Sequence, residues 1–202
     1  PFDVRMIFYH KDVVASRSLP TMTHVIAGPN IGFICSSTWT TPDRFSVGIS
    51  RVMVEMKAGT HDRGTTFFPL YRYDALMGGA PEQVHNFSSE FLEEWSATTN
   101  TRFVSTGRGN GATTTGPEDI LLWLYGLFHS SEYRRRYRAA LAQGFPIVLL
   151  TPYTELLCKL VKLGGKLADL HLLESPTLSQ PMATPIGGSG GAVEKPTWSN
   201  DT

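Results

Sequence analysis

The strongest apolar pattern in the chain begins at Pro117 and predicts two helices of different character. Pro117 is followed by two carboxylates, a combination typical of a helix start, because proline needs no N–H partner there and the helix dipole favours negative charge. Residues 120–128 are apolar apart from a glycine and a tyrosine hydroxyl, so this helix has to be buried on nearly every side. A second helix follows a serine N-cap; its apolar face carries Tyr133, Tyr137 and Leu141, and its other faces carry Arg134, Arg135, Arg136 and Arg138.

Two further helices are predicted on either side of this pair. Residues 88–95 form a short amphipathic pattern, with two aromatic residues and a leucine on one side. From Thr151 onward, leucines recur at helical spacing, and Gly164-Gly165 interrupts that pattern, which predicts a kink.

Residues 1–75 carry the alternation and the β-branched and aromatic runs that predict strands. A pattern of alternating apolar and polar residues covers 51–57, and Pro69 predicts an edge strand or a bulge within 66–73. Between the strands lie two polar loops, residues 36–45 and 58–65, which are the kind of segment where recognition residues gather. The predicted strands are residues 4–9, 31–35, 51–57 and 66–73.

The remaining segments are rich in Gly, Pro, Ser and Thr. Residues 76–116 are predicted to be a connector with one short helix, flexible after residue 96. Gly107-Arg108-Gly109-Asn110-Gly111 lacks the Lys-Ser/Thr of a phosphate-binding loop. Residues 174–202 are predicted to be a flexible tail. The fold class is therefore α+β: a β-rich N-terminal recognition part over residues 1–75, and a helical, bundle-like support over residues 117–173.

Charge is balanced over the whole chain but segregated along it. Eighteen basic residues balance eighteen acidic ones, yet residues 76–131 hold two basic and six acidic side chains, and residues 132–173 hold seven and three. A neutral protein can therefore carry a local basic face. Two distant cysteines in apolar settings, Cys35 and Cys158, predict free thiols and a cytoplasmic location. No apolar run reaches the length of a membrane span, and the strand-like start without Met indicates a fragment of a larger polypeptide.

Catalytic and metal-binding patterns are sparse. The six histidines show no pair at metal-ligand spacing, and no nucleophile elbow is present. Pro42-Asp43 followed by Glu55-x-Lys57 fits the pattern of metal-dependent nucleases, in which two carboxylates hold a divalent ion and a lysine positions water. The alternative interpretation is a solvated strand face with opposite charges. We assign no catalytic and no metal-binding residue.

The other chemical signal is a set of basic residues suited to nucleic acid. Loop arginines can donate two hydrogen bonds to one guanine edge, whereas a basic helix usually contacts phosphates. The arginines of residues 134–138 are equally compatible with a solvated helix face or an acidic protein partner.

The order and spacing of several short motifs resemble one known family over about residues 1–173. The sequence is similar to the C-terminal specificity domain of single-polypeptide Type I (Type ISP) restriction–modification enzymes and to fused adenine methyltransferase–endonucleases. The motifs are Pro1-Phe2-Asp3-Val4-Arg5, Phe8-Tyr9, Phe68-Pro69-Leu70-Tyr71, Asn86-Phe87-Ser88, Pro117-Glu118-Asp119-Ile120, Tyr125-Gly126, His129-Ser130, Tyr133-Arg134, Tyr137, Phe145-Pro146 and Asp169-Leu170-His171-Leu172-Leu173. Gly48-Ile49-Ser50 occupies the family's Gly-Ile-Ser position, although the residues after it depart from the pattern.

The resemblance implies a target recognition domain that gives DNA sequence specificity to a restriction–modification enzyme with adenine-N6 methyltransferase activity. It implies no catalysis and no cofactor in this fragment, but S-adenosylmethionine, ATP and Mg for the full-length enzyme. The implied partners are double-stranded DNA and the methyltransferase module of the same polypeptide, without a membrane. The alternatives are a metal-dependent nuclease domain and a protein-interaction module.

The basic and polar residues of the β-rich part are the expected DNA contacts, and the basic helix is expected to touch phosphates or a neighbouring module. The expected DNA-binding residues are Arg17, Arg44, Ser46, Arg51, Lys57, His61, Arg63 and Arg108, and the expected phosphate or module contacts are Arg134, Arg135 and Arg138.

Overall fold

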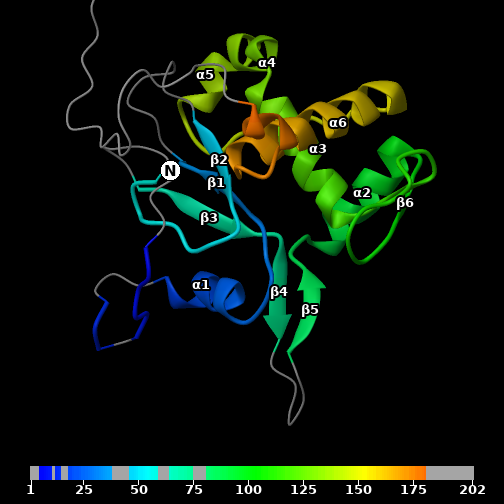
Figure 1. Cartoon of the computed structure of the whole chain (residues 1–202). Coiled ribbons are helices and arrows are strands. Elements are labelled where there is room, and N and C mark those ends of the chain that lie inside the picture. Colours follow the sequence, from blue (N-terminus) through cyan, green and yellow to red (C-terminus); the bar gives the residue numbers. More distant parts are fainter. Residues whose placement is uncertain are drawn as a thin grey trace, which may run out of the picture.

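The described part of the chain forms the mixed α+β fold that the sequence predicts (Figure 1). The structure, a computed structural model, describes residues 5–10, 12–14, 18–37, 46–58, 64–74 and 81–180.

A three-stranded antiparallel sheet organises the N-terminal part. Its order is β2-β1-β3, so β3 is an edge strand, as Pro69 predicts. At one end of the sheet, Cys35 lies opposite Val47 and Thr66; at the other end, Gly32 lies opposite Ser50 and Pro69. The strands are β1 (Gly32–Cys35), β2 (Val47–Ser50) and β3 (Thr66–Pro69).

Helices cover both faces of this sheet (Figure 1). On one face, Ile34 and Phe67 pack against Met22 of α1 (Leu19–Ile26), a helix that the sequence analysis did not predict. On the other face, side chains that alternate with these pack against α3 (Pro117–His129). The period of two along each strand thus divides the sheet between two cores.

A hairpin of β4 (Tyr71–Asp74) and β5 (Glu82–His85) continues from β3. Buried Asn30 fastens it to the sheet. Its amide nitrogen donates to the carbonyls of His24 and Tyr71, and its amide oxygen accepts from the backbone N–H groups of Ile31 and Tyr71. Asn30 therefore makes a long-range contact in which every polar group of its side chain finds a partner.

Residues 96–116 are ordered, which corrects the prediction of a flexible connector. After α2 (Ser89–Thr99), the short strands β6 (Arg102–Phe103) and β7 (Thr114–Thr115) pair in parallel. Buried Thr115 accepts from the indole N–H of Trp95 and joins a hydrogen-bonded chain of threonine hydroxyls. The Asn110 side chain accepts from three successive backbone N–H groups of residues 112–114. Polar composition predicted disorder here, but these hydroxyls and amides satisfy one another internally.

The C-terminal part contains the predicted helices. Ser130 caps α4 (Ser131–Arg136) by accepting from the Tyr133 N–H; α5 (Arg138–Leu141) follows, and α6 (Thr154–His171) continues unbroken through both glycines. The buried side of α6 consists of Leu157, Val161, Gly164 and Ala168. The 3-10 helix η2 (Pro176–Ser179) begins the predicted tail, and residues 181–202 lie outside the described residues.

Helices α3 and α6 cross in close contact at two glycines. A Cβ atom on Gly164 would lie 1.9 Å from the Leu122 carbonyl oxygen, and one on Gly126 would lie 2.6 Å from the Leu160 carbonyl oxygen. Only hydrogen at both positions allows the two backbones to come this near. The glycine pair that the sequence analysis took as a kink site therefore includes a packing contact.

Two predicted strands, at 4–9 and 51–57, do not form within the residues that the structure describes. Residues 5–9 are irregular, and the Met6 and Phe8 side chains are largely exposed. Residues 51–57 form bends and turns, because β1 begins at Gly32 and provides no backbone for these residues to pair with. The Ser50 hydroxyl instead accepts from the Val52 N–H and donates to the Val52 carbonyl. Local alternation cannot form a strand without a neighbouring strand to pair with.

Alanine at Gly164 tests the helix crossing. We expect Gly164→Ala to lower the free energy of unfolding by at least about 2 kcal/mol, because the added methyl group has to push two backbones apart. Gly165→Ala is the matched control: its Cβ would meet only Leu122 Cδ1, at 3.6 Å, and alanine raises helix propensity by up to about 1 kcal/mol. Urea unfolding monitored by circular dichroism measures both, and equal effects would contradict the crossing.

Candidate nucleic-acid interface

Two of the polar residues that the sequence singled out, Ser46 and Lys57, lie at one end of the three-stranded sheet. There β1 ends, and β2 and β3 begin; we call this the loop end of the sheet. Exposed Ser46 immediately precedes β2. The turn that carries exposed Lys57 reaches the same end, because the Met56 carbonyl accepts from the Thr65 N–H at 2.7 Å. Ser46 and Lys57 are therefore brought together at one edge of the fold.

The basic helix α4 adjoins the loop end. Buried Tyr133 shares a core with Cys35, the last residue of β1. Burial raises the pKa of the Tyr133 phenol to about 12, with smaller contributions from the nearby Tyr137 and Cys35. Figure 1 shows α4 and α5 beside the ends of β1 and β2. The tyrosine face that the sequence predicted thus anchors a row of arginines next to the loop end.

These arginines differ in their partners. The Arg134 guanidinium donates to the Phe128 carbonyl at 2.6 Å, so it caps the last turn of α3. Arg135 makes two hydrogen bonds to Glu132 one helical turn earlier, and both side chains are exposed. Arg136 stacks on the Tyr137 ring, and Arg138 is exposed at the start of α5. Arg134 therefore holds the scaffold, whereas the outer arginines face solvent.

Arg51 and Arg108 lie away from the loop end, and each has an acidic partner. Arg51 follows β2 at the opposite end of the sheet and makes two hydrogen bonds, of 2.6 and 3.0 Å, to Glu174. This contact raises the pKa of Arg51 and lowers the pKa of Glu174. Arg108 pairs at 2.9 Å with Asp119, a buried carboxylate that also accepts from the Gly109 and Gly116 N–H groups. The Arg51 pair joins segments 123 residues apart, whereas the Arg108 pair links residues 11 positions apart. The DNA contacts expected of these arginines stay predictions.

Four of the expected DNA contacts lie outside the described residues: Arg17, Arg44, His61 and Arg63. The described residues that flank Arg44 are Ser37 and Ser46, and those that flank His61 and Arg63 are Ala58 and Gly64. The Ser36 hydroxyl donates to the Gly64 carbonyl at 2.8 Å, so these flanking residues belong to the loop end.

The predicted nuclease motif loses its structural basis. No strand places Glu55 and Lys57 on one face; the Glu55 carboxylate instead accepts from the Lys57 backbone N–H at 2.8 Å. Asp43 lies outside the described residues. Among the residues that the structure covers, no cluster of three or more His, Cys, Asp or Glu side chains could hold a metal ion.

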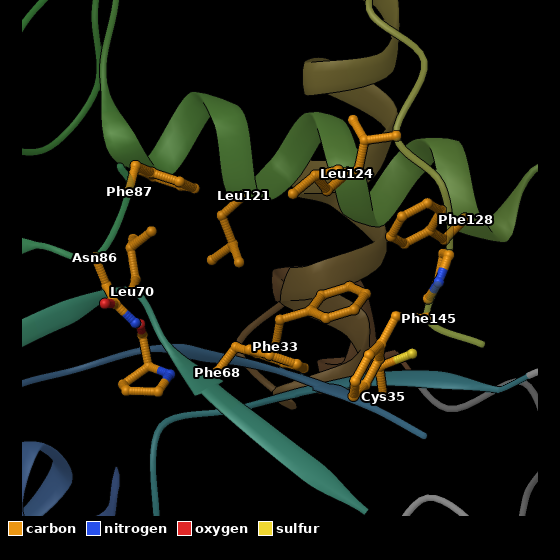
Figure 2. Close-up of a pocket in the computed structure, with 13 residues that line it drawn as sticks. Phe33, Cys35, Phe68, Leu70, Asn86, Phe87, Leu121, Leu124, Phe128 and Phe145 are labelled. Atoms are coloured by element: carbon orange, nitrogen blue, oxygen red, sulfur yellow. The ribbon is translucent and has the colours of Figure 1, made fainter. Parts of the chain in front are cut away.

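An apolar cavity lies between the sheet and α3 (Figure 2). Its volume is about 390 Å³. Phe33 and Cys35 line it from the sheet and Leu121 from α3, while the ring centroids of half-exposed Phe68 and Phe145 lie 5.5 Å apart. Burial raises the pKa of the Cys35 thiol to about 12, so the thiol stays protonated at neutral pH. Such a lining suits an apolar group and not a nucleotide.

A second cavity of about 280 Å³ lies beside β2, and the polar side chains of Ser46, Ser50, Tyr125 and His171 contribute to its wall. The Tyr125 hydroxyl and His171 Nδ1 are hydrogen-bonded, and the neighbouring His129 Nδ1 donates to the Tyr125 carbonyl at 2.9 Å. Sequence reasoning missed this cluster because His171 lies 46 residues from Tyr125; the one available signal was the spacing of Tyr125 and His129, which places both on one face of a helix.

The chain belongs to the family of Type ISP C-terminal specificity domains, whose model matches residues 1–202. This confirms the family that the sequence motifs indicated. No helix in the described part of the chain has the length and apolar character needed to cross a membrane.

Two solved structures are similar to this chain. LlaBIII, an ATP-dependent Type ISP restriction–modification enzyme solved bound to DNA, is 27% identical with a TM-score of 0.54; the match covers 72% of this chain and 8% of LlaBIII. DrdV, solved by cryo-EM in a DNA complex, shares the fold at 23% identity and a TM-score of 0.54. The match covers 76% of this chain and 13% of the DrdV chain. A comparison with curated proteins found no match.

The half-buried His129 of the Tyr125 cluster makes stability depend on pH. Burial lowers the pKa of His129, so the folded protein disfavours the charged imidazole. The unfolded chain then binds more protons below about pH 6.5, and stability falls as pH decreases from there. Burial also lowers the pKa of His85, which acts in the same direction. We expect the melting temperature to fall between about pH 7.5 and 5.5, and to fall less in His129→Gln.

Thermal unfolding at the two pH values measures the effect. His10→Gln, which removes an exposed imidazole, is the control and should keep the wild-type difference. An unchanged difference in His129→Gln would show that other groups cause the pH dependence.

Proposed function

We propose that this chain reads the DNA target of a Type ISP restriction–modification enzyme with adenine-N6 methyltransferase activity, and that the loop end of the sheet is the reading surface. The observation that carries the proposal is the convergence of Ser46, Lys57 and the solvent-facing arginines of α4 and α5 on one edge of a specificity domain. A rigid sheet that holds polar loops at one end suits base reading, and an adjacent row of arginines suits the phosphate backbone.

The scaffold supports this division of roles. Helix α3 packs against the sheet on one side, and Arg134 fixes α4 to its C-terminal end. Base readers at the loop end would therefore keep a constant position relative to phosphate contacts on α4 and α5. Such constancy favours sequence specificity, because phosphate contacts set the register in which bases are read.

The remaining chemistry belongs to other parts of the full-length enzyme. S-adenosylmethionine, ATP and Mg would be bound by modules outside this fragment, and the methyltransferase module would act on the adenine of the site that this domain selects. The family membership supports this assignment and a cytoplasmic location, where the enzyme meets DNA.

Loss of a phosphate contact tests the basic edge. In the full-length enzyme, we expect Lys57→Ala and Arg138→Ala each to weaken DNA binding several-fold at all sequences, and to reduce the slope of log affinity against log salt by about one. Filter binding over a range of salt concentrations measures this. Arg102→Ala is the control, because Arg102 is exposed on β6, far from the loop end in Figure 1. Equal effects of the three changes would argue against a localised basic edge.

Loss of a base contact has a different signature. We expect Arg44→Ala and Arg63→Ala to weaken binding to the methylation site by about 1–3 kcal/mol each, while binding to unrelated duplex changes little. A band shift of the full-length enzyme with matched specific and unrelated duplexes separates the two. If both variants kept site-specific binding, the assignment of base reading to these loops would be wrong.

A further inference from the structure

Helix α6 carries a second apolar stripe besides the one that packs on α3. Five leucines recur at alternating intervals of four and three residues, the seven-residue repeat of helices that pair along a seam. They are Leu156, Leu160, Leu163, Leu167 and Leu170, and we call them the leucine stripe. The residues that α6 buries fully belong to a different set, and of the five leucines only Leu160 and Leu167 pack partly against the core.

The outer side of the leucine stripe is exposed. Leu156, Leu163 and Leu170 are 46%, 59% and 38% accessible, while Leu160 and Leu167 are half-buried at the border with the packed face. Scattered exposed leucines are ordinary on protein surfaces. Three of them at seven-residue intervals on one helix instead form a continuous line, which is typical of a surface that another helix covers.

A row of lysines borders the exposed edge of this stripe: Lys159, Lys162 and Lys166. Lys159 pairs with Glu155 at 2.6 Å, whereas Lys162 and Lys166 have no ion-pair partner within the described residues. Charges beside an apolar seam select the charge of the partner helix. The partner that fits therefore carries carboxylates next to its own apolar face.

We propose that the leucine stripe binds an amphipathic, acidic-flanked helix in the upstream part of the same polypeptide, and so fixes the specificity domain to the rest of the enzyme. The chain matches only 8% of LlaBIII and 13% of DrdV, so most of an enzyme of this family lies outside it. The inference rests on the family membership and not on the proposed DNA contacts.

Two other occupants fit less well. DNA would satisfy the lysines but would leave a line of leucines against phosphates, with no gain from burial. A second copy in antiparallel arrangement would bring two rows of lysines together, and like charges along a helix pair repel.

Thiol labelling in the full-length enzyme tests the proposal. Leu163→Cys would place a thiol at the centre of the stripe. Glu94→Cys, at an exposed position of α2, is the reference. We expect a maleimide to label the thiol introduced on α6 at least tenfold more slowly than the thiol introduced on α2, with labelled peptides identified by mass spectrometry. Equal rates would overturn the proposal. Leu156→Cys repeats the test if the melting temperature shows that the first variant is misfolded.

The source of any protection is then established by three comparisons. Reversal of the lysine row in Lys162→Glu/Lys166→Glu should accelerate labelling at least threefold, whereas Arg102→Glu should not. Protection that depends on enzyme concentration would assign the stripe to a second copy, and protection that appears only with added DNA would assign it to DNA. Either outcome would contradict the proposed helix.

Discussion

The close crossing of α3 and α6 is the constraint on which the rest of the structure depends. Gly126 and Gly164 bring the two backbones into contact, and α3 is thereby held between the sheet and α6. A helix that is apolar on nearly every side cannot lie at a surface, and here each of its sides meets a different partner. The sheet packs against the side of α3 that carries Leu121 and Phe128. Helices α2 and α6 pack against the side that carries Ile120 and Trp123.

Charged groups fix both ends of this central helix. At its start, buried Asp119 accepts from two backbone N–H groups and from Arg108. At its end, Arg134 donates to the Phe128 carbonyl. These arrangements follow the helix dipole, which favours negative charge at the first turn and positive charge at the last. Two of the arginines that a charge census would assign to nucleic acid therefore have structural partners, and the local excess of positive charge overstates the surface available to phosphates.

The sequence predicted the parts of the fold that local patterns determine. Pro117 and the apolar run after it correctly located α3, and the β-branched run at 31–35 located β1. The strand predicted at 51–57 does not form, because strand pairing depends on where β1 begins, and β1 lies outside that segment. The threonine network around Thr115 and the glycine crossing were equally invisible, since each depends on residues that meet only in the folded chain.

The same contrast between local patterns and long-range contacts applies to the candidate site. Ser46 and Lys57 could be selected from sequence because they border the two predicted polar loops, and polar loops between strands are exposed in almost any arrangement of the strands. Whether a given arginine is available to a ligand depends on its acidic partner, and for Arg51 that partner is Glu174, 123 residues away. The interface that we propose is therefore one edge of the sheet and not the full list of basic residues. If the loop end reads DNA as proposed, we expect its specificity to depend less on the number of charges than on the packing of α3, which holds the loop end beside α4.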